Sequence, residues 1–278
     1  NVLKDPVHAD AAERGAKRLA ERINQATGSP RAPPVTKPNV RVDLSRLNIR
    51  QNIDGFGGSV AFWATDADDS AIEAALHGLQ TNILRVQGEV TKTGRTQHNV
   101  DLLKKSLALN PNLQVLLTFW QPRSELQAES SYWLEAVEIN SELHYQLKAA
   151  REQEWADEII SRVRQYAEWG VRPTHLGVQN ESNWSHEGTQ TCRWEPERLR
   201  KFIEGFLKPG LREAGFGEVK VVAPDLAFVG VAASEFQRFL PVMTSPDVDV
   251  MAYHMYDSYN DTMNGALEVL VQNSKAVQ

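Results

Sequence analysis

The feature that most constrains the fold is a regular alternation between short apolar runs and longer segments with helical spacing. Short apolar runs occur at 82–86, 113–119, 175–178, 219–223 and 248–254. Runs of this length are typical of strands buried in a parallel sheet. Because parallel strands need a crossover between them, the intervening segments fit helices that cover such a sheet. The sequence therefore predicts an α/β fold.

The expected helices lie at 70–79, 99–109, 141–169, 196–207 and 232–240, with a weak last helix from about 265. Two of them carry boundary signals. Pro196 fits the first turn of a helix. Gly170 fits the C-terminal cap of the long helix predicted at 141–169.

Polar and aromatic side chains stand at the ends of most predicted strands. They are Arg85, Trp120, Asn180 with Glu181, and His254 with Tyr256. In an open doubly wound sheet, only the strand ends at the switch point meet at a ligand site. In an eight-stranded (β/α)8 barrel of the TIM type, all carboxyl ends meet around one mouth. The distribution therefore favours the barrel, with about six strand–helix units in this chain.

The N-terminal part has a different character. A helical segment at 11–27 has only a thin apolar stripe, and a proline-rich linker follows at 28–38. A short alternating strand is expected at 40–44. We therefore expect an N-terminal helix and linker at 1–39, and the barrel domain at 40–278.

The segment 175–184 holds the residues best suited to chemistry. Its apolar first half predicts a buried strand, and Asn180 and Glu181 stand where that strand leaves the sheet, with Trp184 three residues later. A carboxyl group there can protonate a leaving oxygen, an amide can hold a neighbouring hydroxyl, and an aromatic ring can pack on a sugar. The alternative is an ordinary strand-to-loop turn.

Two other strand residues carry testable expectations. Arg85 lies among Ile83, Leu84 and Val86, and buried arginine is rare without a carboxylate. Arg85 therefore predicts an acid facing it. Trp120 stands at the end of its strand, a position that favours a sugar platform over a core residue.

These residues carry a resemblance to a known family. The motifs are the glycine-rich segment 53–59 (Ile-Asp-Gly-Phe-Gly-Gly-Ser), the strand 82–86, Trp120, the segment 178–181 (Val-Gln-Asn-Glu) and the segment 253–256 (Tyr-His-Met-Tyr). From about Val40 to about Tyr259, the chain resembles glycoside hydrolase family 30, in the clan of retaining barrel glycosidases. The first and fourth motifs together are the most specific part of that likeness.

The resemblance implies a retaining hydrolase of a β-linked glycan, such as xylan or a β-1,6-linked glucan or galactan. It implies Glu181 as general acid/base, Asn180 on the 2-hydroxyl, and Arg85 beside the nucleophile. It further implies that Trp120, His254 and Tyr256 bind the sugar, and Trp184 is added to these from its position near Glu181. No cofactor is expected, and secretion is expected from the family alone.

The chain departs from the family pattern at two points. Ser182 follows Glu181 where the family usually has proline. The family's nucleophile is a glutamate at the end of the seventh strand, and the residues after His254 are too few for two more strand–helix units. We therefore expect a C-terminal remainder or a partner chain to complete the barrel. Glu89 and Asp225, which lie near strand ends, are weaker alternatives for the nucleophile.

Several other functions find little support. The net charge of −6 gives no basic field for nucleic acid, and no apolar run reaches the length of a membrane span. The glycine-rich segment has Val60 where a dinucleotide loop needs glycine. His175 and His186 lack a third metal ligand, so no metal is expected. The rival functions are a non-catalytic carbohydrate-binding barrel and a fragment that needs a partner chain.

Overall fold

The computed structural model describes residues 54–60, 73–89, 95–123, 130–185, 192–230, 234–254 and 256. All of these except Asp54 belong to one compact unit, from Gly55 to Gln278. The helix predicted at 11–27, the linker, the strand at 40–44, the domain boundary at 39 and the last helix from about 265 lie outside the described residues.

A five-stranded parallel sheet organises the unit, with the strand order β1-β2-β3-β6-β7. Its strands are β1 (Gly57–Ser59), β2 (Ile83–Gln87), β3 (Gln114–Thr118), β6 (His175–Gly177) and β7 (Lys220–Val222). Two isolated parallel bridges, Val222↔Val250 and Leu226↔Tyr253, continue the pairing beyond β7. The strand predicted at 248–254 is therefore present only as these bridges, and the predicted parallel sheet is confirmed.

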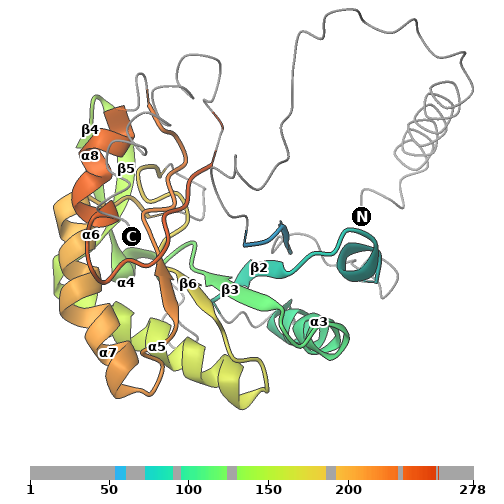
Figure 1. The fold of residues 1–278 in the computed structure, drawn as a ribbon. Helices are drawn as coiled ribbons and strands as arrows, with labels where there is room; N and C mark the ends of the chain where they lie inside the picture. Colours follow the sequence, from blue (N-terminus) through green and yellow to red (C-terminus); the bar gives the residue numbers. More distant parts are fainter. Residues whose placement is uncertain are drawn as a thin grey trace, which may run out of the picture. The chain divides into compact units, whose positions relative to one another are not determined.

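Helices cover the sheet, as the alternation predicted. Figure 1 shows α6 (Pro196–Phe202) and α7 (Lys208–Glu213) to the left of the strands, with α5 (Glu152–Glu168) running below them. A π-helical stretch, η5 (Ile203–Leu207), joins α6 to α7. The remaining helical elements of the described residues are η3 (Ala74–Gly78), α3 (Arg95–Leu109), α4 (Ser130–Trp133), η4 (Ala149–Arg151) and α8 (Ser234–Met243).

The core lies between the sheet and these helices. Val115 and Leu117 of β3 are fully buried, as are Trp155, Ile159 and Val163 of α5. The α5 residues recur at helical spacing, so one face of that helix is apolar and packs inward. A fully buried side chain of this size contributes roughly 1.5–3 kcal/mol to folding.

The end of α5 confirms the predicted cap at Gly170. Gly170 has a φ of +86°, a conformation that glycine adopts without a Cβ clash. Its N–H donates to the Ala167 carbonyl at 3.0 Å, and Val171 N–H donates to the Tyr166 carbonyl at 2.9 Å. These two bonds form a Schellman motif, which ends the helix and aims the chain toward β6.

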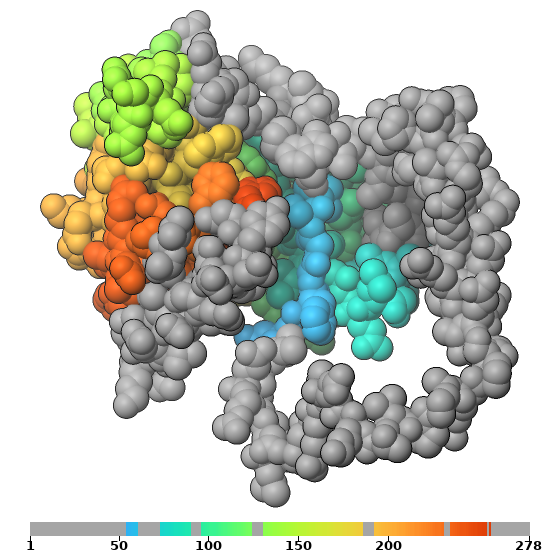
Figure 2. All heavy atoms as spheres, turned by 90° about the horizontal axis from the view of Figure 1, so that it is seen from above, coloured from blue at the N-terminus to red at the C-terminus, as the bar shows by residue number. Residues whose placement is uncertain are grey.

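The long helix predicted at 141–169 is wrong in its first half. Residues 142–147 form β5 (Glu142–Leu147), which pairs with β4 (Leu134–Ile139) as an antiparallel hairpin. Helical structure begins only at the short 3-10 helix η4 (Ala149–Arg151), which leads into α5. The hairpin loop is Asn140-Ser141, with φ values of 54° and 63°. Positive φ at both loop residues is the requirement of a type I′ turn. In the view from above, the light-green hairpin forms a lobe on one side of the unit (Figure 2).

Candidate active site

Four polar side chains predicted or considered at strand ends come together at the carboxyl end of the sheet. Arg85 is on β2, Glu181 follows β6, Asp225 follows β7, and His254 follows the bridged segment at 250–253. They are linked by ion pairs and hydrogen bonds, although the chain separates Arg85 from Asp225 by 140 residues. We call Arg85, Asn180, Glu181, Asp225 and His254 the strand-end cluster.

Asp225 is the acid that Arg85 required. Arg85 Nη2 lies 3.2 Å from Asp225 Oδ2 and donates to Asn180 Oδ1 at 2.6 Å. Arg85 Nε donates to Thr118 Oγ1 at 3.0 Å. The side chains of Arg85 and Asp225 are 20% and 7% exposed, so this pair is largely withdrawn from water. The expectation of a carboxylate facing Arg85 is confirmed.

His254 lies between the two carboxylates of the cluster. Its Nδ1 is 2.9 Å from Glu181 Oε1, and its Nε2 is 3.2 Å from Asp225 Oδ1. Burial lowers the pKa of His254, but the bonds to Asp225 and Glu181 outweigh that effect and raise the pKa to about 9. His254 is therefore a cation at neutral pH, with one proton facing each carboxylate.

The backbone at Glu181 and Asp225 shares an uncommon conformation. Both residues have positive φ, 56° and 53° respectively, which is uncommon for residues other than glycine. Ser182 N–H donates to the Asp225 carbonyl at 3.3 Å, and the Ser182 hydroxyl donates to the Pro224 carbonyl. These bonds join the exit of β6 to the exit of β7, so the loop that carries Glu181 and the loop that carries Asp225 are fixed to each other.

Trp120 lies inside the protein rather than on an open surface. It is 6% exposed, and the Arg85 guanidinium carbon is 4.5 Å from the centre of its ring. Glu89 Oε1 accepts hydrogen bonds from the backbone N–H groups of Trp120 and Gln121. Gln179 Nε2 donates to the Trp120 carbonyl at 2.6 Å. The ring therefore supports Arg85 and offers little surface to a sugar.

Glu89 is a buried carboxyl group that supports the backbone after β3. It is 3% exposed, and burial raises the pKa of its carboxyl group, against the lowering effect of its bond from Gln121. Its contacts with the Trp120 and Gln121 backbone fix the exit of β3. Glu89 therefore supports the site through the backbone of β3.

Three aromatic side chains, those of Tyr256, Phe228 and Trp184, border the strand-end cluster. The Tyr256 ring lies 5.5 Å from the His254 ring and 6.1 Å from Phe228, which lies 6.2 Å from Trp184. Tyr256 is 61% exposed, while Trp184 and Phe228 are half-buried. Burial and the charge of Glu181 raise the pKa of Tyr256. Phe228 was not predicted from the sequence, and the signal that could have found it is its place three residues after the strand-end acid Asp225.

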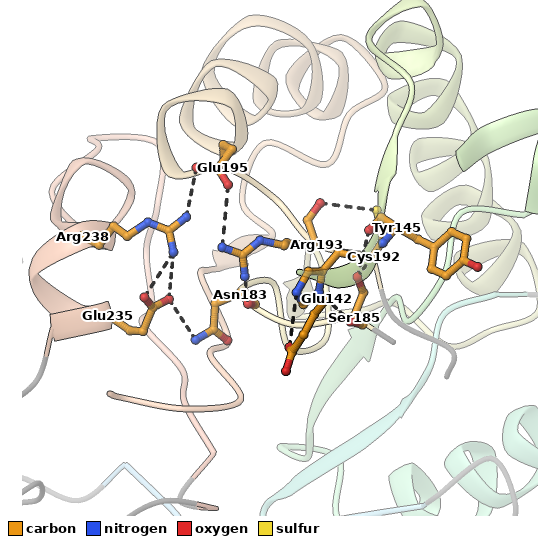
Figure 3. A network of polar contacts seen from close by, with 10 residues as sticks. Glu142, Tyr145, Asn183, Ser185, Cys192, Arg193, Glu195, Glu235 and Arg238 are labelled. Carbon is orange, nitrogen blue, oxygen red and sulfur yellow. Dashed lines mark hydrogen bonds and ion pairs between the residues drawn. The ribbon is translucent and has the colours of Figure 1, made fainter. Parts of the chain in front are cut away.

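A polar network holds the loop that follows Glu181 (Figure 3). Asn183 Oδ1 accepts from Ala227 N–H at 2.8 Å, and Asn183 Nδ2 donates to the Phe228 carbonyl at 2.8 Å. Ser185 Oγ accepts from the Tyr145 N–H of the hairpin at 2.8 Å. The loop is thus bonded on one side to the β7 exit and on the other to β5.

The described residues provide no metal centre. They contain no group of three or more histidine, cysteine, aspartate or glutamate side chains placed to hold an ion. His175 Nδ1 lies 2.9 Å from the Thr174 hydroxyl, and His186 lies outside the described residues. Among the helices described, none combines the length and the apolar character needed to cross a membrane.

Comparison with known proteins supports the fold. Neither a protein-family model nor a curated protein matches the chain. Three solved structures each have a TM-score of 0.61. A family 30 endoxylanase from Clostridium papyrosolvens is 21% identical, with 81% of this chain and 55% of that chain covered. SrfJ from Salmonella typhimurium is 20% identical, with 80% and 54% covered. An endo-β-1,6-glucanase is 16% identical, with 81% and 56% covered.

The fold is therefore that of the family 30 barrel glycosidases, which confirms the predicted fold class. The chain spans about half the length of these solved structures. Their low sequence identity extends the likeness to the fold and no further.

Proposed function

We propose that the protein is a retaining glycoside hydrolase acting on a β-linked polysaccharide, with Glu181 as its general acid/base. The observation that carries this proposal is the position of Glu181. Glu181 is 7% exposed at the carboxyl end of β6, with its Oε1 2.9 Å from His254 Nδ1, and it follows Asn180 in the chain. Catalytic groups of barrel enzymes stand at such strand ends.

In this mechanism Glu181 acts twice. It first donates a proton to the glycosidic oxygen as the bond to the anomeric carbon breaks. It then takes a proton from the water that releases the sugar from the enzyme. After the first transfer, the new Glu181 carboxylate is stabilised by the His254 N–H that already faces Oε1.

Other members of the proposed site orient the sugar. Asn180 Oδ1 accepts from Arg85 Nη2 at 2.6 Å, so the side-chain amide nitrogen Nδ2 points elsewhere and can donate to the 2-hydroxyl. We assign His254, Tyr256 and Trp184 to the walls of the sugar site. Trp120 belongs to the site through Arg85, whose guanidinium covers its ring.

The nucleophile is proposed to lie outside the described residues. Retention needs a second carboxylate about 5–5.5 Å from Glu181. Both oxygens of Asp225 already face cations, Arg85 and His254, which makes Asp225 a poor nucleophile. We propose that a further strand, from this polypeptide or from a partner chain, supplies that carboxylate.

The substrate is proposed to be a glycan such as xylan or a β-1,6-linked glucan, processed outside the cytoplasm. Two of the solved structures with this fold are an endoxylanase and an endo-β-1,6-glucanase. The acidic balance of the chain, with a net charge of −6, suits a neutral glycan better than a polyanionic one.

The test is substitution of Glu181 in the active form of the protein. Glu181→Ala should reduce polysaccharide hydrolysis by about 10²–10⁴-fold, the usual contribution of a general acid. Aryl glycosides with acidic leaving groups should lose far less in the first step, and azide should restore turnover by replacing the activated water.

Glu213→Ala is the matched control, because Glu213 is an exposed glutamate at the end of α7. It should leave both substrates unaffected. Equal losses on both substrates with Glu181→Ala, and no azide rescue, would refute the acid/base assignment. Tight glycan binding without turnover by the unaltered protein would favour the non-catalytic alternative.

A further inference from the structure

Asp225 contacts two cations with its two oxygens, Arg85 through Oδ2 and His254 through Oδ1, although it has no direct part in the proposed reaction. We propose that Asp225 is a positioning residue that fixes the orientation and the charge of His254, and through His254 the proton donor Glu181. This inference deepens the proposed function and rests on it for its catalytic consequence. Its structural part can be tested without any substrate.

The geometry gives His254 little freedom to turn. Both ring nitrogens are in contact with a carboxylate: Nε2 lies 3.2 Å from Asp225 Oδ1, and Nδ1 lies 2.9 Å from Glu181 Oε1. The His254 backbone N–H donates to the Leu226 carbonyl at 2.6 Å, one residue after Asp225. A flip of the ring would remove both ring contacts, so Asp225 and Glu181 hold the ring in one orientation, while the Leu226 carbonyl fixes the backbone that carries it.

The backbone of Asp225 is fixed to the loop that carries Glu181. The Asp225 carbonyl accepts the Ser182 N–H at 3.3 Å, next to Glu181. Asp225 itself has a φ of 53°, a backbone conformation that residues other than glycine rarely adopt. Asp225 is thus bonded through its backbone to the Glu181 loop and through its side chain to the ring that touches Glu181.

The charges around His254 come from four elements. Glu181 faces it from the β6 exit, Asp225 from the β7 exit, and Arg85 on β2 reaches Asp225; Tyr256 follows His254 in the chain. With His254 protonated, two carboxylates are balanced by two cations. Both ring nitrogens then carry a proton, and each donates a hydrogen bond to one carboxylate. In neutral His254, one nitrogen would bring its lone pair against a carboxylate oxygen.

Removing the charge of Asp225 should therefore release the proton of His254 more easily. In Asp225→Asn, the imidazolium keeps one carboxylate, Glu181, while its burial is unchanged. An opposite charge at this distance shifts a pKa by about 1–3 pH units. The pKa of His254, about 9 in the unaltered protein, should fall by that amount.

The experiment is an NMR titration of the histidine side chains in the full chain labelled with 15N. His254→Gln assigns the signal by its loss. In the unaltered protein at pH 7, both His254 nitrogens should show the protonated shift. In Asp225→Asn, the titration midpoint should be lower by about 1–3 pH units. Asp101→Asn, on the exposed face of α3, is the matched control and should change nothing.

Two results would overturn the inference. One is a neutral His254 at pH 7 in the unaltered protein, a measurement that does not depend on the folding of any variant. The other is an unmoved His254 midpoint in a folded Asp225→Asn. In the active form, Asp225→Asn should also move the alkaline limb of the pH profile of kcat to lower pH. Covalent labelling of Asp225 by a fluoroglycoside would instead show that Asp225 is the nucleophile. Loss of the Glu181 assignment alone would leave the NMR result standing.

Discussion

Replacing Arg85 by methionine should destabilise the protein far more than a surface arginine substitution. Methionine keeps much of the apolar stem but removes the charge and three donated contacts, to Asp225, Asn180 and Thr118. Removing one partner of a buried ion pair typically costs 3–5 kcal/mol, because the other charge stays buried. Asp225 retains His254, so we expect the lower end, about 3 kcal/mol.

The matched control is Arg172→Met. Arg172 pairs with Glu218, but the two side chains are 56% and 59% exposed. Exposed pairs contribute about 0–1 kcal/mol, so this variant should differ little from the unaltered protein. Urea unfolding followed by tryptophan fluorescence measures both variants under one condition, and the midpoint shift at constant slope gives the free-energy difference.

A double variant tests the cause of the loss. If the cost of Arg85→Met comes from an uncompensated Asp225 charge, adding Asp225→Asn should recover at least about 1 kcal/mol of it. A merely steric effect would make the two losses add. Should Arg85→Met prove no more costly than Arg172→Met, the strand-end cluster would not be the buried charge network that its contacts indicate.

Two further predictions follow from individual side chains. Folding raises the pKa of His254 from 6.5 to about 9, so the stabilisation from its protonated form is complete below pH 6.5 and is lost as the pH rises through 9. Urea unfolding measured from pH 6 to 10 should therefore show the free energy of unfolding decline by a few kcal/mol, and His254→Gln should abolish that decline. A decline that persists in His254→Gln would assign the effect to another group. A Trp120 that serves only as a sugar platform would be dispensable for stability, but Trp120 is 6% exposed. Trp120→Ala should therefore lower the free energy of unfolding by about 3–5 kcal/mol, and Trp120→Phe by clearly less, as measured in thermal unfolding. A melting temperature unchanged by Trp120→Ala would restore the platform role.

The strands of the sheet were predictable because their signal is local. β3, β6 and β7 fall inside apolar runs identified in the sequence, and β2 extends one residue beyond its run at 82–86, since a strand buried on both faces needs continuous apolar residues. The hairpin was not predictable in the same way. Leu143 and Leu147 are spaced by one helical turn, but Leu143 is exposed and Leu147 is fully buried, so they do not share the buried face that a helix would need. The decisive signal was the Asn140-Ser141 turn, which helical periodicity overlooks.

The partners within the site could be predicted only in kind. The apolar neighbours of Arg85 required an acid, but the sequence could not show which one, because the contact joins residues 140 positions apart. Strand register decides that pairing: Arg85 lies opposite Leu116, which lies opposite His175, and the exits of β6 and β7 then follow. The burial of Trp120 likewise depends on where Arg85 lies, and local sequence carries no information about that.

The charge balance of the strand-end cluster suggests how Glu181 can serve as both acid and base in the proposed reaction. As described, Arg85 and His254 balance Glu181 and Asp225, so the cluster alone has no excess charge. A nucleophilic carboxylate placed beside it would add one negative charge, and like charges close together favour a proton on one of them. Asp225 contacts two cations, Arg85 and His254, with its two oxygens, so Glu181 is the carboxyl group of the cluster that we assign as the acid. Once the nucleophile is bound to the sugar as a neutral ester, the excess charge is gone and Glu181 is stable as the carboxylate that activates water. The two cations therefore set which carboxyl group carries the proton at each step, and Asp225 and Arg85 take part in that choice without touching the sugar.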